Sequence, residues 1–408
     1  MYVLKGRVID GNGGAPIERG AVAVEGNRII AVCNEWEYPV PENAEVIEVG
    51  DGTILPGFIE GHCHLGLGDD YFRIYREHAY HAVCRVVSEM KVLLDGGFTT
   101  LRECGGMTNY LKGAWEEGLI DGPRICSSGR CVIQTGGHLD YIKDFPIEFT
   151  KHHDRNFASE IADGVTEVRR TVRMHFREKC DFIKVMGTAG VACQGNKLFT
   201  REYSDEELRA FVQEAENYGS YVAIHAHGID GIRAAIRAGV RSIEHASYID
   251  ERACEDLMKI GGWIVPTLAT GHISLQNLDK RAPWVGPKLK AACAKKGETL
   301  RLAHEMGVTI GFGADYGGGE VTDFRLDGLE FPLLVSEGGL SPMEAIVAAT
   351  KTGAHIVMRE QELGTLECGK LADIVVCKGN PLQDIALLAD QENIKVVLQD
   401  GKVKKRID

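Results

Sequence analysis

Several features are absent from this chain of 408 residues. None of its 12 cysteines forms a Cys-x-x-Cys pair, and their scatter shows no framework spacing, so we expect reduced thiols rather than a disulfide scaffold. No apolar run approaches the roughly 18 residues that a membrane span needs, and the first residues resemble a strand rather than a signal peptide. Lys and Arg total 46 against 59 Asp and Glu, a net charge of −13 that argues against nucleic-acid or membrane partners. We therefore expect a cytoplasmic protein, with a disulfide-bonded secreted protein as the less favoured alternative.

The two ends of the chain share a β-rich character. Short alternating segments separated by Gly and Asn turns predict strands near both termini, at 1–8, 21–25, 28–32, 44–48, 373–377 and 394–398. This pattern suggests that the termini pair into one small β domain. We therefore predict a domain formed by residues 1–56 and 362–408, with a separate unit over 57–361.

The middle of the chain alternates strands with helices. Eight short apolar segments predict buried parallel strands, at 58–62, 99–103, 124–128, 182–186, 221–225, 242–245, 263–267 and 308–314. Capping boxes beginning at Ser204 and Ser341 predict two helix starts, and Gly219 and Gly239 predict helix ends. The simplest fold is an α/β (β/α)8 TIM barrel joined to the terminal β-sandwich domain, although a doubly wound open sheet gives a similar pattern.

Two histidines follow the first of these apolar segments. Residues i and i+2 of a strand point to the same side, so His62 and His64 face one point. Imidazole is a common metal ligand, and two rings at one strand end provide half of a site. This spacing also arises by chance, so the motif alone is weak.

Further metal-competent residues stand at the ends of other predicted strands. Lys184 lies in the fourth strand, His225 ends the fifth, His245 ends the sixth and Asp315 follows the eighth. Each alone has an ordinary explanation, such as a core histidine or a helix-capping aspartate. Active sites of (β/α)8 barrels lie at the carboxyl ends of the strands, where these side chains would converge. The sequence therefore predicts a metal site.

Lys184 is unusual in this set because apolar residues flank it in its strand. Burial beside metal ions disfavours a protonated amine, and a neutral amine can add CO2 to become a carbamate. We expect a carboxylated Lys184 that bridges two ions. The alternative is a snorkelling or salt-bridged lysine without a metal role.

Several motifs resemble those of the amidohydrolase superfamily. Leu55-Pro56-Gly57-Phe58-Ile59-Glu60-Gly61-His62-Cys63-His64 is similar to the family's opening motif, although Glu60 stands where the family usually has Asp. The segment at 363–373 resembles the family's entry into its closing β domain. Three further stretches, Gly136-Gly137-His138, His225-Ala226-His227-Gly228 and Ser242 to Ser247, resemble the Xaa-Pro dipeptidase (prolidase)-like branch. The loop after Asp315 departs from that branch, and on a barrel such loops set substrate choice.

The resemblance implies a binuclear site containing two divalent metal ions, with zinc favoured. His62, His64 and Asp315 would hold one ion, His225 and His245 the other, and carboxylated Lys184 and a hydroxide would bridge them. Asp315 would transfer the proton to the leaving nitrogen, and His138 would hydrogen-bond the substrate carbonyl oxygen. His227 would contact a substrate carboxylate or support the site from behind. Further candidate substrate contacts are Tyr141, Arg201, Tyr203 and Tyr316, whereas Glu244 should point away from the site and brace the barrel.

The expected reaction is hydrolysis of an amide bond by the bridging hydroxide. The substrate would be small and carboxylate-bearing, such as an Xaa-Pro or other dipeptide or an N-acyl amino acid. Alternatives are an imidazolonepropionase-like ring hydrolase or deaminase, which would not need Lys184, a lactonase or phosphotriesterase, and a non-catalytic relative. We expect a small-molecule substrate as the partner, and a homo-oligomer is possible.

Overall fold

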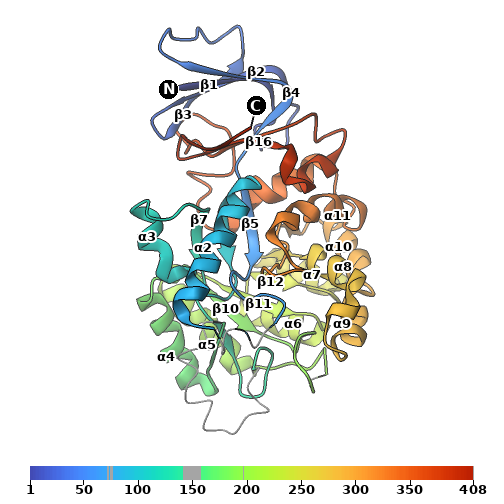
Figure 1. The fold of residues 1–408 in the computed structure, drawn as a ribbon. Helices are drawn as coiled ribbons and strands as arrows, with labels where there is room; N and C mark the ends of the chain where they lie inside the picture. The colour runs from blue at the N-terminus through green and yellow to red at the C-terminus, as the bar shows by residue number, and fades with distance from the viewer. Residues whose placement is uncertain (71–72, 74–76, 141–157, 196, 408) are drawn as a thin grey trace.

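The computed structural model describes residues 1–70, 73, 77–140, 158–195 and 197–407, and a barrel of parallel strands surrounded by helices occupies its centre (Figure 1). Strands pair in the orders β5-β6-β7 and β14-β13-β12-β11-β10-β8-β9. Two backbone hydrogen bonds connect these two sets of strands and close the barrel: Asp315 N donates to His62 O at 2.7 Å, and Asp181 N donates to Ser127 O at 2.8 Å. The barrel strands are β5 (Phe58–Cys63), β6 (Phe98–Glu103), β7 (Arg124–Ser127), β8 (Cys131–Ile133), β10 (Ile183–Met186), β11 (Val222–Ala226), β12 (Ser242–His245), β13 (Trp263–Val265) and β14 (Thr309–Ile310), and β9 (Ser159–Ile161) extends the second run.

The eight expected barrel strands are confirmed, with two differences in detail. The third continues past Gly129, which has a φ of +64°, so that β7 and β8 form its two halves. The eighth pairs as a strand only at Thr309–Ile310, not over the whole of 308–314. Gly313 lies against His62 here, since a Cβ atom at Gly313 would come 2.8 Å from His62 N.

Helices cover the outside of the barrel (Figure 1). Both capping boxes are confirmed, at Ser204 with Glu207 and at Ser341 with Glu344, and Gly239 ends its helix with a φ of +97°. The α-helices are α2 (Ala79–Asp95), α3 (Lys112–Glu116), α4 (Gly164–Arg177), α5 (Asp205–Asn217), α6 (Ile229–Ala238), α7 (Glu251–Lys259), α8 (Leu268–Gln276), α9 (Val285–Cys293), α10 (Lys296–Glu305), α11 (Glu330–Ser336), α12 (Pro342–Val347) and α13 (Gly353–Ile356). No helix in the described part of the chain is long and apolar enough to cross a membrane.

Strands from both ends of the chain form a second, mixed sheet, as the sequence predicts. Its order is β17-β16-β15-β4-β1-β2-β3. One apolar cluster includes residues from six of its strands, and Ala372 N donates to Asn27 O at 2.9 Å, so the sheet curves around its own core. The strands are β1 (Tyr2–Val8), β2 (Ile17–Glu25), β3 (Arg28–Asn34), β4 (Glu45–Pro56), β15 (Ile374–Cys377), β16 (Ile394–Gln399) and β17 (Lys402–Arg406).

The curved sheet is fastened to the amino-terminal end of the barrel. Arg124 at the start of β7 bonds Asp373 Oδ2 and Asp400 Oδ1, both at 2.7 Å. Gln399 Nε2 donates to Thr99 O at 2.9 Å. These contacts lie at the opposite end from the carboxyl ends of the strands, which are left free for a site. The domain boundaries after residues 56 and 361 remain predictions.

Candidate active site

Three of the predicted ligands meet at the end of β5. His64 Nε2 lies 3.2 Å and His62 Nε2 lies 3.6 Å from Asp315 Oδ1. One ligand atom from each of the three residues lies within 4.8 Å of the other two. The structure therefore brings together the residues that the sequence assigned to the first ion.

The remaining ring nitrogens of the two histidines face hydrogen-bond acceptors. His64 Nδ1 lies 3.1 Å from Gly105 O, and His62 Nδ1 lies 2.6 Å from Glu244 Oε2. A carbonyl or carboxylate oxygen can only accept, so each Nδ1 carries a proton, and each Nε2 is the atom that would offer its lone pair to a metal ion. Burial and then Lys184 lower the pKa of His62 to about 4, which keeps this ring neutral, as a metal ligand must be.

His225, His245 and Lys184 lie beside this group. The ring centroids of His225 and His245 are 4.5 Å apart, and those of His62 and His245 are 5.1 Å apart. Lys184 Nζ, which is fully buried, lies 3.2 Å from His62 Nε2. The strand neighbours of Lys184 and His225 are apolar and belong to the barrel's hydrophobic core: Ile183 and Val185 flank Lys184, and Ile224 and Ala226 flank His225.

This group fits a pair of divalent ions. His225 Nε2 is buried and has no hydrogen-bond partner among the described residues, which is costly unless a ligand satisfies it. Burial lowers the pKa of both His225 and His245 well below the usual value, so both rings are neutral. Four imidazoles and the Asp315 carboxylate form a donor set that suits zinc, manganese, iron or cobalt.

The backbone is strained where several strands end at the site. His245, Thr267 and Asp315 have φ values of +69°, +54° and +59°, which residues other than glycine rarely adopt. Thr267 Oγ1 lies 2.7 Å from His245 Nδ1 and fixes the orientation of that ring. Strain at three neighbouring strand ends is typical of a functional site.

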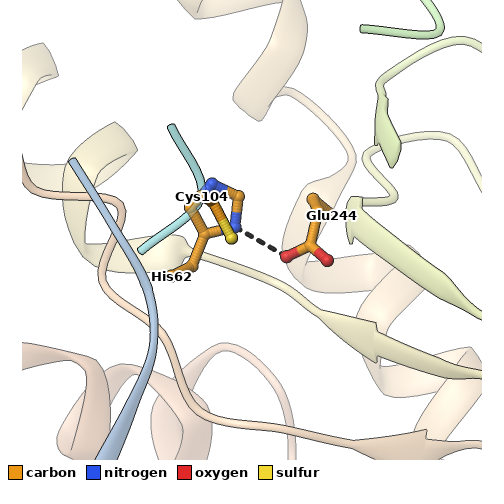
Figure 2. Close-up of side chains that lie close together, drawn as sticks. All are labelled: His62, Cys104 and Glu244. Atoms are coloured by element: carbon orange, nitrogen blue, oxygen red, sulfur yellow. Dashed lines mark hydrogen bonds and ion pairs between the residues drawn. The ribbon is translucent and has the colours of Figure 1, made fainter. Parts of the chain in front are cut away.

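The prediction for Glu244 is wrong in orientation, because its side chain points into the barrel and contacts a site residue, but Glu244 does brace the barrel through bonds to Arg102 and Ser242. Ile243 packs outward, so Glu244 faces inward, and the positive φ of His245 turns the next side chain to the site as well. Figure 2 shows the Glu244 carboxylate bonded to the His62 ring. Arg102 Nη2 donates to both Glu244 oxygens at 2.7 Å, and Arg102 Nε donates to Gly61 O at 2.6 Å. Burial opposes ionisation, but Arg102 and His62 outweigh it and lower the pKa of Glu244.

His62, Glu244 and Cys104 also satisfy the distance criterion for a metal site (Figure 2). The chemistry of these three residues does not fit a metal ion, because the Arg102 guanidinium already occupies both Glu244 oxygens. Burial also raises the pKa of the Cys104 thiol to about 12, so the thiolate that a metal needs does not form at neutral pH. We interpret this group as the support behind His62.

His138 lies across the site, with its ring centroid 4.5 Å from that of His225. Its Nδ1 lies 3.4 Å from Cys193 Sγ, which accepts the Leu139 N–H at 3.0 Å. If the thiol donates its own proton to Nδ1, the His138 Nε2 carries the other proton and becomes a donor. Gly190 packs against this ring, because a Cβ atom there would come 2.3 Å from His138 Nε2.

A cavity of about 130 Å³ opens beside these side chains. His227 lines it, with Nδ1 2.9 Å from Ser247 Oγ, and burial followed by the charge of Lys296 lowers the pKa of His227 to about 3. Five of the predicted ligands line the cavity: His64, Lys184, His225, His245 and Asp315. The other lining residues include His138 and His227, the α9 residues Val285, Leu289, Ala292 and Cys293, and the cationic residues Arg281 and Lys296.

Of the remaining candidate substrate contacts, none that the structure describes lies at the cavity. Tyr141 lies outside the described residues. Arg201 bonds Asp205, the buried Tyr203 hydroxyl donates to Ala162 O at 3.1 Å, and buried Tyr316 does not line the cavity, so the structure does not bring these three residues to it. Sequence reasoning also missed Arg102, Cys193 and Lys296, which belong to no motif.

Comparison with known proteins gives a consistent result. The model of the amidohydrolase family matches residues 53–404. Ochratoxinase of Aspergillus niger is 31% identical over 99% of this chain and 86% of its own. An imidazolonepropionase of Symbiobacterium thermophilum is 24% identical over 89% of this chain and 84% of its own.

Two solved structures extend the comparison. A prolidase complexed with N-methylphosphonate-L-proline superposes with a TM-score of 0.92 at 34% identity, covering 100% of both chains. A Xaa-Pro dipeptidase with methionine bound in its active site has a TM-score of 0.88 at 30% identity, covering 98% of this chain and 99% of its own.

Proposed function

Because this chain belongs to the amidohydrolase family and is a metal-dependent hydrolase of amide or peptide bonds, we propose that its substrate is small and carries a carboxylate. Xaa-Pro and other dipeptides and N-acyl amino acids are the classes that we favour. A prolidase and a Xaa-Pro dipeptidase among the similar structures support this choice.

The residues that would hold the metal ions are those around Asp315. His62, His64 and Asp315 would bind one divalent ion and His225 with His245 the other, with carboxylated Lys184 between them. When bound, such ions lower the pKa of a water molecule and polarise a carbonyl group. Zinc is our preferred ion.

Asp315 is the proposed proton carrier. Burial opposes its ionisation, but His64 and His62 outweigh burial and lower its pKa, so it is a carboxylate at neutral pH. In this position Asp315 can accept the proton of the attacking water and deliver it to the leaving nitrogen.

His138 is the proposed donor to the substrate carbonyl oxygen. Burial is the main cause that lowers its pKa to about 3, so the ring is neutral, and with the Cys193 thiol donating to Nδ1 it would donate through Nε2. A donor aimed at the oxygen stabilises the charge that develops as the carbonyl carbon becomes tetrahedral.

The observation that carries the proposal is the convergence of the metal-competent side chains beside one small cavity. Its volume of about 130 Å³ is near the roughly 150 Å³ that accommodates a benzene molecule in an engineered cavity. A proline ring or a single apolar side chain fits this scale. The bulky ligands of a nucleic-acid or protein-binding module do not.

Screening tests the proposal. Metal-loaded protein is assayed against Xaa-Pro dipeptides, other dipeptides and N-acyl amino acids, with lactones, a phosphotriester and cyclic amidines as controls. We expect amide hydrolysis at least tenfold above any control reaction. A greater rate with a lactone or a phosphotriester would overturn the substrate assignment, and ring opening or deamination of a cyclic amidine would favour the imidazolonepropionase-like alternative.

A further inference from the structure

Three cationic side chains line the cavity within the described chain, and one of them has no assigned role. Lys184 is the proposed carbamate, and Arg281 is paired with Asp69 at 2.9 Å. Lys296, at the start of α10, is only 6% exposed. Its Nζ donates to Thr267 O at 2.7 Å and to Thr267 Oγ1 at 3.2 Å, and it forms no ion pair with any described residue.

The acids nearest to Lys296 do not neutralise it. Both Glu330 oxygens accept backbone N–H groups, from Leu268 at 3.0 Å and Ala269 at 2.7 Å, and burial raises the pKa of Glu330 to about 8. Burial thus disfavours the Glu330 carboxylate, and its two oxygens are already occupied by these backbone groups. Asp315 faces the histidines of the proposed metal site. Lys296 thus keeps one free N–H donor and a charge that lacks a partner, and its pKa is lowered by burial.

The surroundings of Lys296 complete a binding surface for an amino acid. His227 and Lys296 both line the cavity. Thr299, one helical turn after Lys296, donates to Ser247 O at 3.0 Å and so fixes the segment that contacts His227. An apolar wall stands beside these polar groups, formed by Val285, Leu289 and Ala292 of α9.

The geometry points to Lys296 as the residue that binds the free carboxylate of the amino acid released by the reaction, with His227 beside it and the α9 wall against the side chain. This inference rests on the proposed function and adds a residue that sets specificity. It predicts that the protein discriminates a substrate with a free carboxylate from the same substrate ending in a carboxamide.

The test compares Ala-Pro and N-acetyl-methionine with their C-terminal carboxamides. Wild-type protein should favour each acid at least tenfold in kcat/KM, since a charge-assisted hydrogen bond corresponds to roughly a ten- to hundredfold effect. Lys296→Met should lose about that factor on the acids and change less than threefold on the carboxamides. Lys296→Arg should keep an intermediate preference, and Lys295→Met, at the exposed neighbouring position, is the matched control.

A structural role for Lys296, acting through Thr267 and His245, would lower acids and carboxamides equally, and that result would overturn the inference. Binding of L-methionine and L-methioninamide to metal-loaded protein, measured by calorimetry, gives a readout without catalysis. Wild type should bind the acid at least tenfold more tightly, and Lys296→Met should bind both alike. Equal binding by wild type overturns the inference, whereas preferential binding of the acid without amide hydrolysis supports it and refutes only the proposed function.

Discussion

Replacing Glu244 with glutamine removes the charge on which several buried donors converge. His62 Nδ1, Arg102 Nη2 and Ser242 Oγ all lie 2.6 or 2.7 Å from its oxygens. An amide offers one accepting oxygen, and its NH2 group must face at least one of these donors. Arg102 also loses its only ion-pair partner among the described residues. We expect the free energy of unfolding to fall by about 3–5 kcal/mol.

The same substitution should weaken zinc binding. Removing a carboxylate that bonds a ligating histidine lowers metal affinity by roughly ten- to hundredfold, or about 1.4–2.7 kcal/mol. The double variant with Arg102→Met and Glu244→Gln removes the stranded guanidinium. It should regain most of the stability but keep the weak zinc affinity.

Two measurements separate these effects. Urea unfolding of the metal-free protein gives the stability, and competition with a chelator gives the zinc Kd. Ser242→Ala is the matched control, because it removes one hydrogen bond to Glu244, costs about 1 kcal/mol and should leave the Kd unchanged. A Glu244→Gln protein that binds zinc within twofold of wild type would refute the argument that Glu244 supports His62 as a ligand.

Substitutions at four further positions test the site. Lys184→Ala should bind less metal and lose activity, and formate or acetate should partly restore the activity. In wild type, mass spectrometry should show a CO2 adduct that is lost on acidification. Failure of the rescue or absence of the adduct would contradict a carbamate. His138→Ala should lower kcat by about thirtyfold to a thousandfold, equivalent to about 2–4 kcal/mol. Cys193→Ala should lower kcat about two- to tenfold, and Cys193→Ser should retain most of the wild-type kcat. Unchanged turnover of a variant in steady-state assays would refute the role of the residue that it replaces. Gly190→Ala should displace the His138 ring and lower kcat without changing metal content, unlike Gly113→Ala, where an added Cβ meets nothing within 4 Å.

The sequence was sufficient to predict the parts of the site that depend on strand periodicity. His62 and His64 share a face because they are two residues apart, and Ile224 with Ala226 packs outward while His225 and His227 face inward. The barrel follows from short apolar strands between capped helices. The breadth of the family match, residues 53–404, agrees with this interpretation.

Residues outside that periodicity could not be predicted. Glu244 and His245 are adjacent, so alternation assigns them to opposite sides, but the φ of +69° at His245 breaks the alternation. Lys296 stands at a helix start and Cys193 in a loop. Tertiary packing alone brings these two residues beside the cavity and His138, and neither has a sequence signature.

The metal content of the purified protein tests the central claim most directly. After loading with zinc and removal of free ions, elemental analysis should give two zinc ions per chain. Anomalous scattering from crystals should place both among His62, His64, Lys184, His225, His245 and Asp315. One ion per chain would contradict the binuclear site, and no anomalous signal among these side chains would contradict the account as a whole.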